Sequence, residues 1–129
     1  DGSDGLGATQ FHRVIYEFMV QGGGYTAQGA LKPAQPPIIH EGPNNQSNVR
    51  GTIAMARTDD PNSATSQFFV NHVDNPFLDY TSPSVPGYVV FGHVTEGMDT
   101  IDAIASVPTS ASDEPFTAVM IESATIVSM

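Results

Sequence analysis

The sequence lacks cysteine and tryptophan and has only four basic residues among 129. Without cysteine the chain forms neither disulfides nor thiolate metal sites, and its composition leaves the redox compartment open. The four Lys and Arg stand against fourteen Asp and Glu, giving a formal net charge of −10. Because such a charge repels phosphate backbones and anionic headgroups, we expect neither nucleic acid nor a membrane surface as a partner.

Long apolar runs are also absent from the sequence. No stretch approaches the length of a membrane span, and the first ten residues, DGSDGLGATQ, lack the charged and apolar regions of a signal peptide. We therefore expect a soluble protein, in the cytoplasm or the periplasm. The length is that of one domain, so we expect a single domain over residues 1–129 with a Gly-rich, irregular start over 1–10.

Short segments with the composition of β-strands dominate what is present. They are rich in β-branched and aromatic residues, and turn-forming residues lie between them. These segments are residues 11–21, 52–58, 67–73, 88–94 and 118–127. Two longer segments between them, 22–51 and 74–87, are rich in Gly and Pro and predict ordered loops.

Only residues 95–107, TEGMDTIDAIASV, predict a helix, with its centre near 96–105. Apolar residues recur there three and four positions apart, and Thr95 is expected as the N-cap. These residues are Met98, Ile101, Ile104 and Ala105. The whole pattern predicts a mainly β fold, an antiparallel sandwich or closed barrel, with active groups where long loops meet strands.

Two familiar kinds of site are weakly supported by the residues. GGGYTA at 22–27 fits a dinucleotide-binding Gly pattern, but three prolines soon after it prevent the helix that would face the phosphates. The four histidines show no i,i+4 pair, so the fold alone would have to assemble a metal site, and structural or surface roles are favoured. Ser66 lacks the G-x-S-x-G context of a hydrolytic nucleophile. We therefore expect no metal and no nucleotide cofactor.

Four blocks of sequence carry a more specific signal. They are FHRVIYEFMVQGG at 11–23, GTIAMARTDDPNSATSQFFVN at 51–71, FLD at 77–79 and GYVVFGHVTEGMDTIDAI at 87–104. Together, and in this order, they resemble the cyclophilins of bacterial type, the peptidyl-prolyl cis/trans isomerases or rotamases. The resemblance implies an eight-stranded antiparallel closed β-barrel capped by two helices, with a proline-binding groove on one outer face.

The resemblance also implies an activity and its partners. A cyclophilin catalyses rotation about X-Pro peptide bonds in unfolded or flexible chains and so assists protein folding, without cofactor or metal. The expected partners are proline-containing peptides and unfolded protein clients. Two alternatives stay open: a peptide-binding module with the same groove and little turnover, and a β-sandwich binder of unknown ligand.

Residue by residue, the resemblance assigns the site. Arg13 matches the catalytic arginine, whose guanidinium is a planar, permanently charged donor. Gln21 and Gln67 match the amides that orient it and the substrate, and the main chain of Ala56 and Arg57 matches the segment that pairs with the peptide. The remaining positions expected to bind substrate are Phe18, Met19, Phe69, Phe77, Leu78 and Tyr88.

The chain departs from the family pattern at several of these places. Tyr16-Glu17 replaces the usual Pro-Gly, which alters a turn beside Arg13 and bears on peptide preference. Arg57 stands where many members have Asn. Phe77 occupies the place of a tryptophan and Tyr88 that of a histidine in many eukaryotic members, so we expect weak binding of cyclosporin, to which the tryptophan indole donates.

The largest departure lies at the start of the sequence. The family has two strands and a helix before the FHRV block, and only ten Gly-rich residues precede it here. We expect an N-terminally incomplete cyclophilin, whose unpaired strand edges would favour association. Three explanations remain open: a fragment of a longer chain, which we favour, strands supplied by another polypeptide, and a fold that closes with fewer strands.

Overall fold

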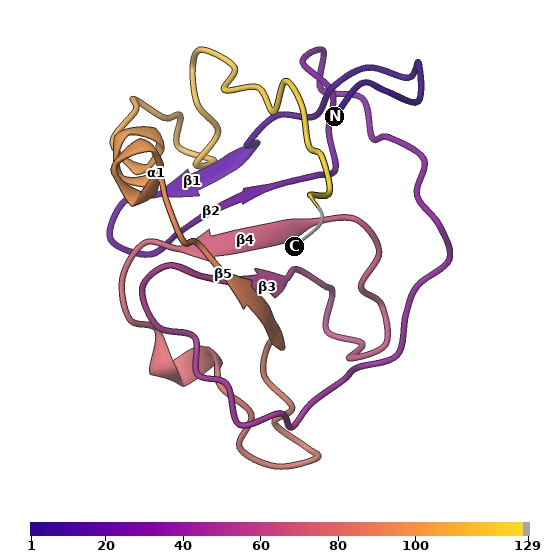
Figure 1. Ribbon diagram of the computed structural model, residues 1–129, viewed down its shortest axis with the longest axis vertical. Helices are drawn as coiled ribbons and strands as arrows, with labels where there is room; N and C mark the ends of the chain where they lie inside the picture. The colour runs from indigo at the N-terminus through magenta and orange to yellow at the C-terminus, as the bar shows by residue number, and fades with distance from the viewer. Residues whose placement is uncertain (128–129) are drawn as a thin grey trace.

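The computed structural model describes residues 1–127, and its central element is one five-stranded antiparallel sheet with the strand order β1-β2-β4-β3-β5 (Figure 1). The strands are β1 (Arg13–Ile15), β2 (Met19–Gly22), β3 (Thr52–Met55), β4 (Phe68–Asn71) and β5 (Val90–His93). A short 3-10 helix, η1 (Pro76–Leu78), and one α-helix, α1 (Met98–Ala105), complete the elements. The predicted mainly β fold with one helix is confirmed. Among residues 1–127, no pairing between β1 and β5 closes the sheet into a ring.

The predicted strand over 11–21 is wrong as one element, because a turn divides it into β1 and β2. Glu17 has a φ of 58°, and the N–H of Phe18 donates to the carbonyl of Ile15 at 3.0 Å. A positive φ in a turn normally calls for Gly or Asn, and neither occurs between residues 11 and 21. The composition therefore gave no sign of the chain reversal.

The predicted strand over 118–127 is also wrong. Met120 forms a single antiparallel bridge with Gln10, and Val119 and Ile121 each share one backbone hydrogen bond with the segment at 9–11. Pairing stops there, and Ile126 is almost fully exposed. The β-branched residues of this segment thus pair with a neighbouring segment over only a few positions, which is too short a pairing to form a strand.

The other predicted elements are confirmed with narrower bounds. The segments 52–58, 67–73 and 88–94 contain β3, β4 and β5. Helix α1 begins after Gly97, which has a φ of 95° and is the N-cap, so the prediction of Thr95 as N-cap is wrong. Gly tolerates that left-handed conformation without strain, which fixes where the helix starts.

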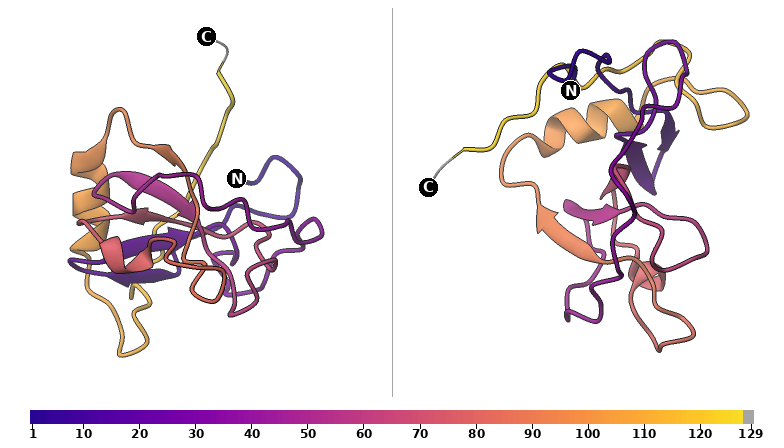
Figure 2. Two further views of the ribbon diagram at one scale, coloured as in Figure 1. Left: turned by 90° about the horizontal axis from the view of Figure 1, so that it is seen from below. Right: turned by 90° about the vertical axis from the view of Figure 1, so that its right-hand side faces the viewer.

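The two faces of the sheet bury different groups of residues. Val14, Val20 and Val70 lie on the face against α1, where they contact Phe11 and Ala105. Met19, Ala54, Phe69 and Val90 form a second buried cluster. Each buried valine contributes about 1.5–3 kcal/mol. Successive side chains along a strand point to opposite faces, so the two clusters lie on opposite sides of the sheet. Helix α1 covers the first face (Figure 2) and leaves the second available for a site.

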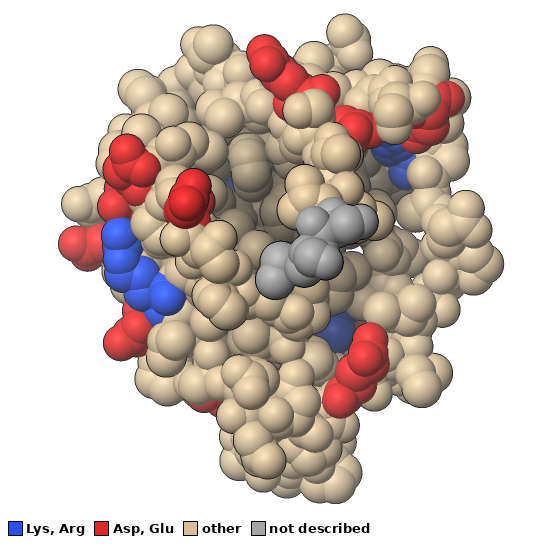
Figure 3. All heavy atoms as spheres, in the orientation of Figure 1, with Lys and Arg blue, Asp and Glu red and all other residues tan. Residues whose placement is uncertain are grey.

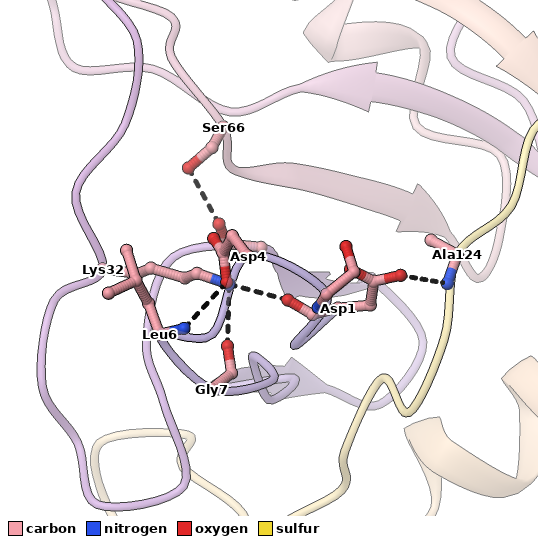
Figure 4. Close-up of polar contacts among 9 residues, drawn as sticks. Asp1, Asp4, Leu6, Gly7, Lys32, Ser66 and Ala124 are labelled. Atoms are coloured by element: carbon pink, nitrogen blue, oxygen red, sulfur yellow. Dashed lines mark hydrogen bonds and ion pairs between the residues drawn. The ribbon is translucent and has the colours of Figure 1, made fainter.

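A single lysine holds the beginning of the chain in place (Figure 4). The ammonium of Lys32 donates to the carbonyls of Asp1 and Gly7, each at 2.7 Å, and pairs with the carboxylate of Asp4 at 3.0 Å. The other end is tied to the same place, because the N–H of Ala124 donates to the Asp1 carboxylate at 3.1 Å. The Gly-rich start is thus connected to the rest of the chain by these contacts.

The acidic composition is visible on the surface. Carboxylates are scattered around the rim of the face in Figure 3, with few basic side chains among them. In the described part of the chain, no helix is both long and apolar enough to cross a membrane.

Candidate active site

The register of the sheet places several predicted site residues in one row. Arg13 on β1 lies opposite Gln21 on β2, Gln21 lies opposite Phe69 on β4, and Phe69 lies opposite Ala54 on β3. Directly opposed side chains in antiparallel strands are within contact distance on one face. The short β1–β2 hairpin therefore brings residues eight apart in sequence together.

Three polar side chains form a relay that begins in this row with Arg13 and Gln21 and ends at Gln67, just before β4. The guanidinium of Arg13 donates to Oε1 of Gln21 at 3.3 Å, and Nε2 of Gln21 donates to Oε1 of Gln67 at 2.9 Å. Within residues 1–127, Arg13 has no carboxylate at ion-pair distance. Its charge and most of its five donors are thus available to a ligand.

The position of Gln67 depends on a close approach of two loops. A Cβ on Gly24 would lie 2.6 Å from the side-chain amide of Gln67, so only Gly leaves that amide its present place. Gly23 has a φ of 91°, and a Cβ there would lie 2.5 Å from the carbonyl of Ser66. The two glycines after β2 allow the chain to pass close to the start of β4.

Next to the relay is an apolar pocket of about 230 Å³. It is lined by Arg13, Phe18, Met19, Gln21, Ala56, Arg57, Phe69, Leu78 and Tyr88. Met19 and Phe69, which are 2 % and 5 % exposed, belong to the second buried cluster and are the most buried residues of the pocket lining. All nine lining residues are among the eleven that the resemblance assigns to the site.

The two predicted residues outside the lining contact residues that belong to it. Gln67 reaches the pocket through Gln21, as described above. Phe77 is 71 % exposed, and its ring stacks on that of Phe18 with centroids 5.8 Å apart. Phe77 thus flanks the pocket and supports one of its walls.

Arg57 and Tyr88 are in contact with each other and form another part of the pocket lining. The guanidinium carbon of Arg57 lies 4.6 Å from the centre of the Tyr88 ring, and its Nη2 donates to the carbonyl of Gly87. The N–H of Ala56 donates to the carbonyl of Gln67 at 3.0 Å and is not available to a peptide. The backbone N–H and C=O of Arg57, however, have no intrachain hydrogen bond in the described residues. An added strand would therefore pair at Arg57.

A buried amide network that sequence reasoning missed supports these walls. Asn48, Asn71 and Asn75 are at most 3 % exposed and hydrogen-bond to one another. Nδ2 of Asn48 donates to the carbonyl of Tyr88 at 3.0 Å, and Nδ2 of Asn75 donates to that of Phe18 at 3.0 Å. Amides in loop sequences such as NNQSN look solvent-exposed, so only the three-dimensional structure reveals this role.

Asp79 anchors the same network on the far side of η1. Its carboxylate accepts hydrogen bonds from the hydroxyl of Ser47 and from the backbone and side chain of Asn48. Burial by itself would raise the pKa of Asp79, but these hydrogen bonds outweigh it and lower the pKa below its usual 3.8. Asp79 is therefore ionised at neutral pH.

His12 precedes Arg13 and lies beside Tyr25, with ring centres 4.6 Å apart. Burial, and then the nearby charge of Arg13, lower the pKa of His12, so its ring is neutral at pH 7. The part of the chain that the structure describes contains no group of three His, Asp or Glu side chains placed to hold a metal ion.

A larger cavity of about 910 Å³ runs along β3 and β5. It shares Arg57 with the pocket but contains none of Arg13, Gln21 and Gln67. We therefore place the candidate active site in the smaller pocket, where the charged donor meets apolar walls.

Comparison with known proteins identifies the family of this chain. Residues 4–126 match the family model described as cyclophilin type peptidyl-prolyl cis-trans isomerase/CLD. A peptidyl-prolyl cis-trans isomerase of Streptomyces antibioticus is 52% identical over 124 residues, which cover 92% of this chain and 75% of that protein. Peptidyl-prolyl cis-trans isomerase B of Escherichia coli is 48% identical over 124 residues, covering 92% and 76%.

A solved structure is similar as well. It is a cyclophilin type peptidyl-prolyl cis-trans isomerase of Cryptosporidium parvum, crystallised in the presence of the dipeptide Ala-Pro, with a TM-score of 0.72 and 26% sequence identity. The match covers 91% of this chain and 73% of the other. By its family match, its bacterial relatives and its fold, this chain belongs to the cyclophilin-type peptidyl-prolyl cis-trans isomerases.

Proposed function

We propose that this chain catalyses cis–trans rotation about X-Pro bonds in flexible or unfolded polypeptides, with Arg13 as the catalytic residue. The observation that carries the proposal is the relay from Arg13 through Gln21 to Gln67 beside an apolar pocket. Family membership supports the same reaction.

The reaction itself sets what the site must supply. Rotation about a peptide bond crosses a barrier of about 18–20 kcal/mol, and isomerisation of X-Pro takes on the order of 10–100 s unaided. Turnover in milliseconds requires that barrier to fall by about 5–7 kcal/mol, at about 1.36 kcal/mol per tenfold. No covalent bond is made or broken, so binding the twisted amide more tightly than the planar one is sufficient.

The residues of the pocket meet this requirement in distinct ways. Met19 and Phe69 would contact the proline ring, while the free backbone N–H and C=O of Arg57 would pair with the peptide as an added strand. The guanidinium of Arg13 would donate to the prolyl amide as conjugation is lost and its nitrogen lone pair localises. Gln21 holds that guanidinium in advance, so little reorganisation is needed during the reaction.

The proposed partners follow from the same pocket. They are proline-containing peptides and unfolded client proteins, and the proposal needs no metal and no cofactor. Cyclosporin binding should be weak, because the side chain of Phe77 has no N–H to donate.

Exchange NMR on an Ala-Pro tetrapeptide tests the proposal with the unmodified chain and Arg13→Ala. Loss of one preorganised donor should reduce kcat/KM by about 10²–10³. Arg13 is exposed, so the thermal melting curve should change little. An Arg13→Lys variant keeps the charge without the planar donor fork and should also lose most activity.

Two results would contradict the proposal. If the unmodified chain binds the peptide without accelerating exchange, it is a peptide-binding module. If Arg13→Ala retains more than half of the activity per folded molecule, the role of Arg13 is wrong.

A further inference from the structure

The turn between β1 and β2 has a conformation that its residues do not favour. Glu17 has a φ of 58°, in the left-handed region, at the third position of the four-residue turn from Ile15 to Phe18. Gly takes such a position without strain, whereas a residue with a side chain is strained there. Something outside the turn must therefore stabilise it.

The ring of His72, just after β4, makes that contact. Its Nδ1 accepts a hydrogen bond from the N–H of Glu17 at 3.0 Å, and the ring of Tyr16 lies against it with centres 5.4 Å apart. His72 is only 7 % exposed. One side chain thus contacts both residues that replace the Pro-Gly of the family pattern.

The orientation of the His72 ring is fixed from its other side. Nε2 lies 3.1 Å from the carboxylate of Asp102 on α1, and that carboxylate accepts both Nη groups of Arg50, at 2.7 and 2.8 Å. Because Nδ1 accepts from the N–H of Glu17, it is Nε2 that carries a proton and donates it to Asp102. The arrangement leaves Nδ1 available only to the turn.

The same residue also holds the backbone of Phe18. The N–H of His72 donates to the carbonyl of Phe18 at 2.9 Å, and Nδ2 of Asn75 donates to that carbonyl at 3.0 Å. The ring of Phe18 lines the apolar pocket. A change in the turn would therefore change the wall that contacts the substrate.

We propose that His72 is a positioning residue: it holds the strained Tyr16–Glu17 turn and thereby keeps Phe18 in place as a wall of the substrate pocket. The inference rests on the proposed isomerase function, because it gives that pocket to the substrate. Loss of the His72 contact should reduce the fraction of molecules with a formed pocket and raise KM without altering Arg13.

Two substitutions of His72 separate this role from general stability. In His72→Asn the side-chain oxygen can take the place of Nδ1 and accept from Glu17. In His72→Gln the amide reaches the place of Nε2 and keeps a donor to Asp102, but nothing accepts from Glu17. Loss of that one hydrogen bond in His72→Gln should raise KM about threefold to tenfold, with kcat within about twofold. His72→Asn should keep KM within about twofold of the unmodified chain.

A rescue experiment tests the link to strain. Glu17→Gly removes the cost of the positive φ, so KM of the double variant with His72→Gln should return to within about twofold of Glu17→Gly alone. His93→Gln, an exposed histidine on β5, is the matched control and should leave KM unchanged.

Amide hydrogen exchange at Glu17 gives a readout that does not need turnover. His72→Gln should expose this amide to exchange, and His72→Asn should protect it. If the unmodified chain shows no isomerase activity, the proposed function fails while this exchange still tests the role of His72. Equal KM and equal Glu17 exchange in the Asn and Gln variants, or no rescue by Glu17→Gly, would overturn the inference.

Discussion

Arg13 and Gln21 lie directly opposite each other in the β1–β2 hairpin, and the guanidinium of one donates to the amide oxygen of the other at 3.3 Å. The amide nitrogen of Gln21 donates to Oε1 of Gln67, so the side chain of Gln21 presents its oxygen to Arg13. The amide of Gln21 is therefore oriented by a residue 46 positions away, and it orients the proposed catalytic residue.

This relay predicts a non-additive pair of substitutions. Gln21→Ala removes the contact to Arg13 and should reduce kcat/KM about threefold to tenfold, the value of one hydrogen bond. Gln67→Ala should have a smaller effect, because it acts only through Gln21. The double variant should match Gln21→Ala alone in exchange NMR. If the reductions in kcat/KM of the two single variants multiply in the double variant, the two amides act independently.

A second prediction concerns the glycines after β2. Gly24→Ala would displace the flexible side chain of Gln67 while leaving the backbone unstrained, so activity should fall as in Gln67→Ala. Its stability in urea unfolding should change by less than about 0.5 kcal/mol. Gly23→Ala is the contrasting variant: its φ of 91° and the nearby Ser66 carbonyl predict a loss of more than about 1 kcal/mol. Equal stability of the two variants would contradict this account.

A third prediction concerns acid. The folded pKa of Asp79 is lowered, so its contribution to stability is present above the unfolded pKa near 3.8 and is lost as the pH falls through the folded value. Asp79→Asn should therefore be less stable than the unmodified chain at pH 7, and the difference should shrink below about pH 4. Urea unfolding at several pH values measures it. A difference that is constant with pH would rule out this role for the carboxylate. Ser47→Ala, which removes one donor, should show a weaker form of the same dependence.

Cyclosporin provides a fourth prediction. Phe77→Trp adds an indole N–H beside the pocket and should tighten binding by up to about tenfold, the upper value of one hydrogen bond. Since the sequence has no tryptophan, the new residue also reports binding by its fluorescence. Phe91→Trp, at an exposed position on β5, is the control and should bind as weakly as the unmodified chain. Tight cyclosporin binding to the unmodified chain would show that the lack of an indole N–H at position 77 does not weaken binding.

The sequence predicted the parts of the fold in which local pattern and tertiary pairing agree. The β-branched segments at 52–58 and 67–73 contain neighbouring strands, and the apolar spacing after residue 95 does form a helix. The same reasoning was wrong over 11–21, since Glu17 adopts a glycine-like φ that the composition does not show. It was also wrong over 118–127, where strand-forming residues have almost no partner.

For the site, the resemblance supplied the lining of the pocket, and the structure supplies the reasons for its shape. The contacts of Gln67 with Gly24 and of His72 with Glu17 join residues more than 40 positions apart. Such contacts depend on the pairing of β2 with β4, which no local pattern encodes. The buried asparagines were missed for a related reason, because amides favour turns in sequence and are buried only when all their hydrogen bonds are met.

Lys32 is the only lysine in the chain, and its side chain is 10 % exposed, with three oxygen atoms around its ammonium. In the folded protein this amine is therefore shielded from acylating reagents, which must reach its nitrogen to react. Release of residues 1–7 would expose it. The rate at which Lys32 is acetylated, followed by mass spectrometry, thus measures how often the beginning of the chain opens, with no substitution in the sequence.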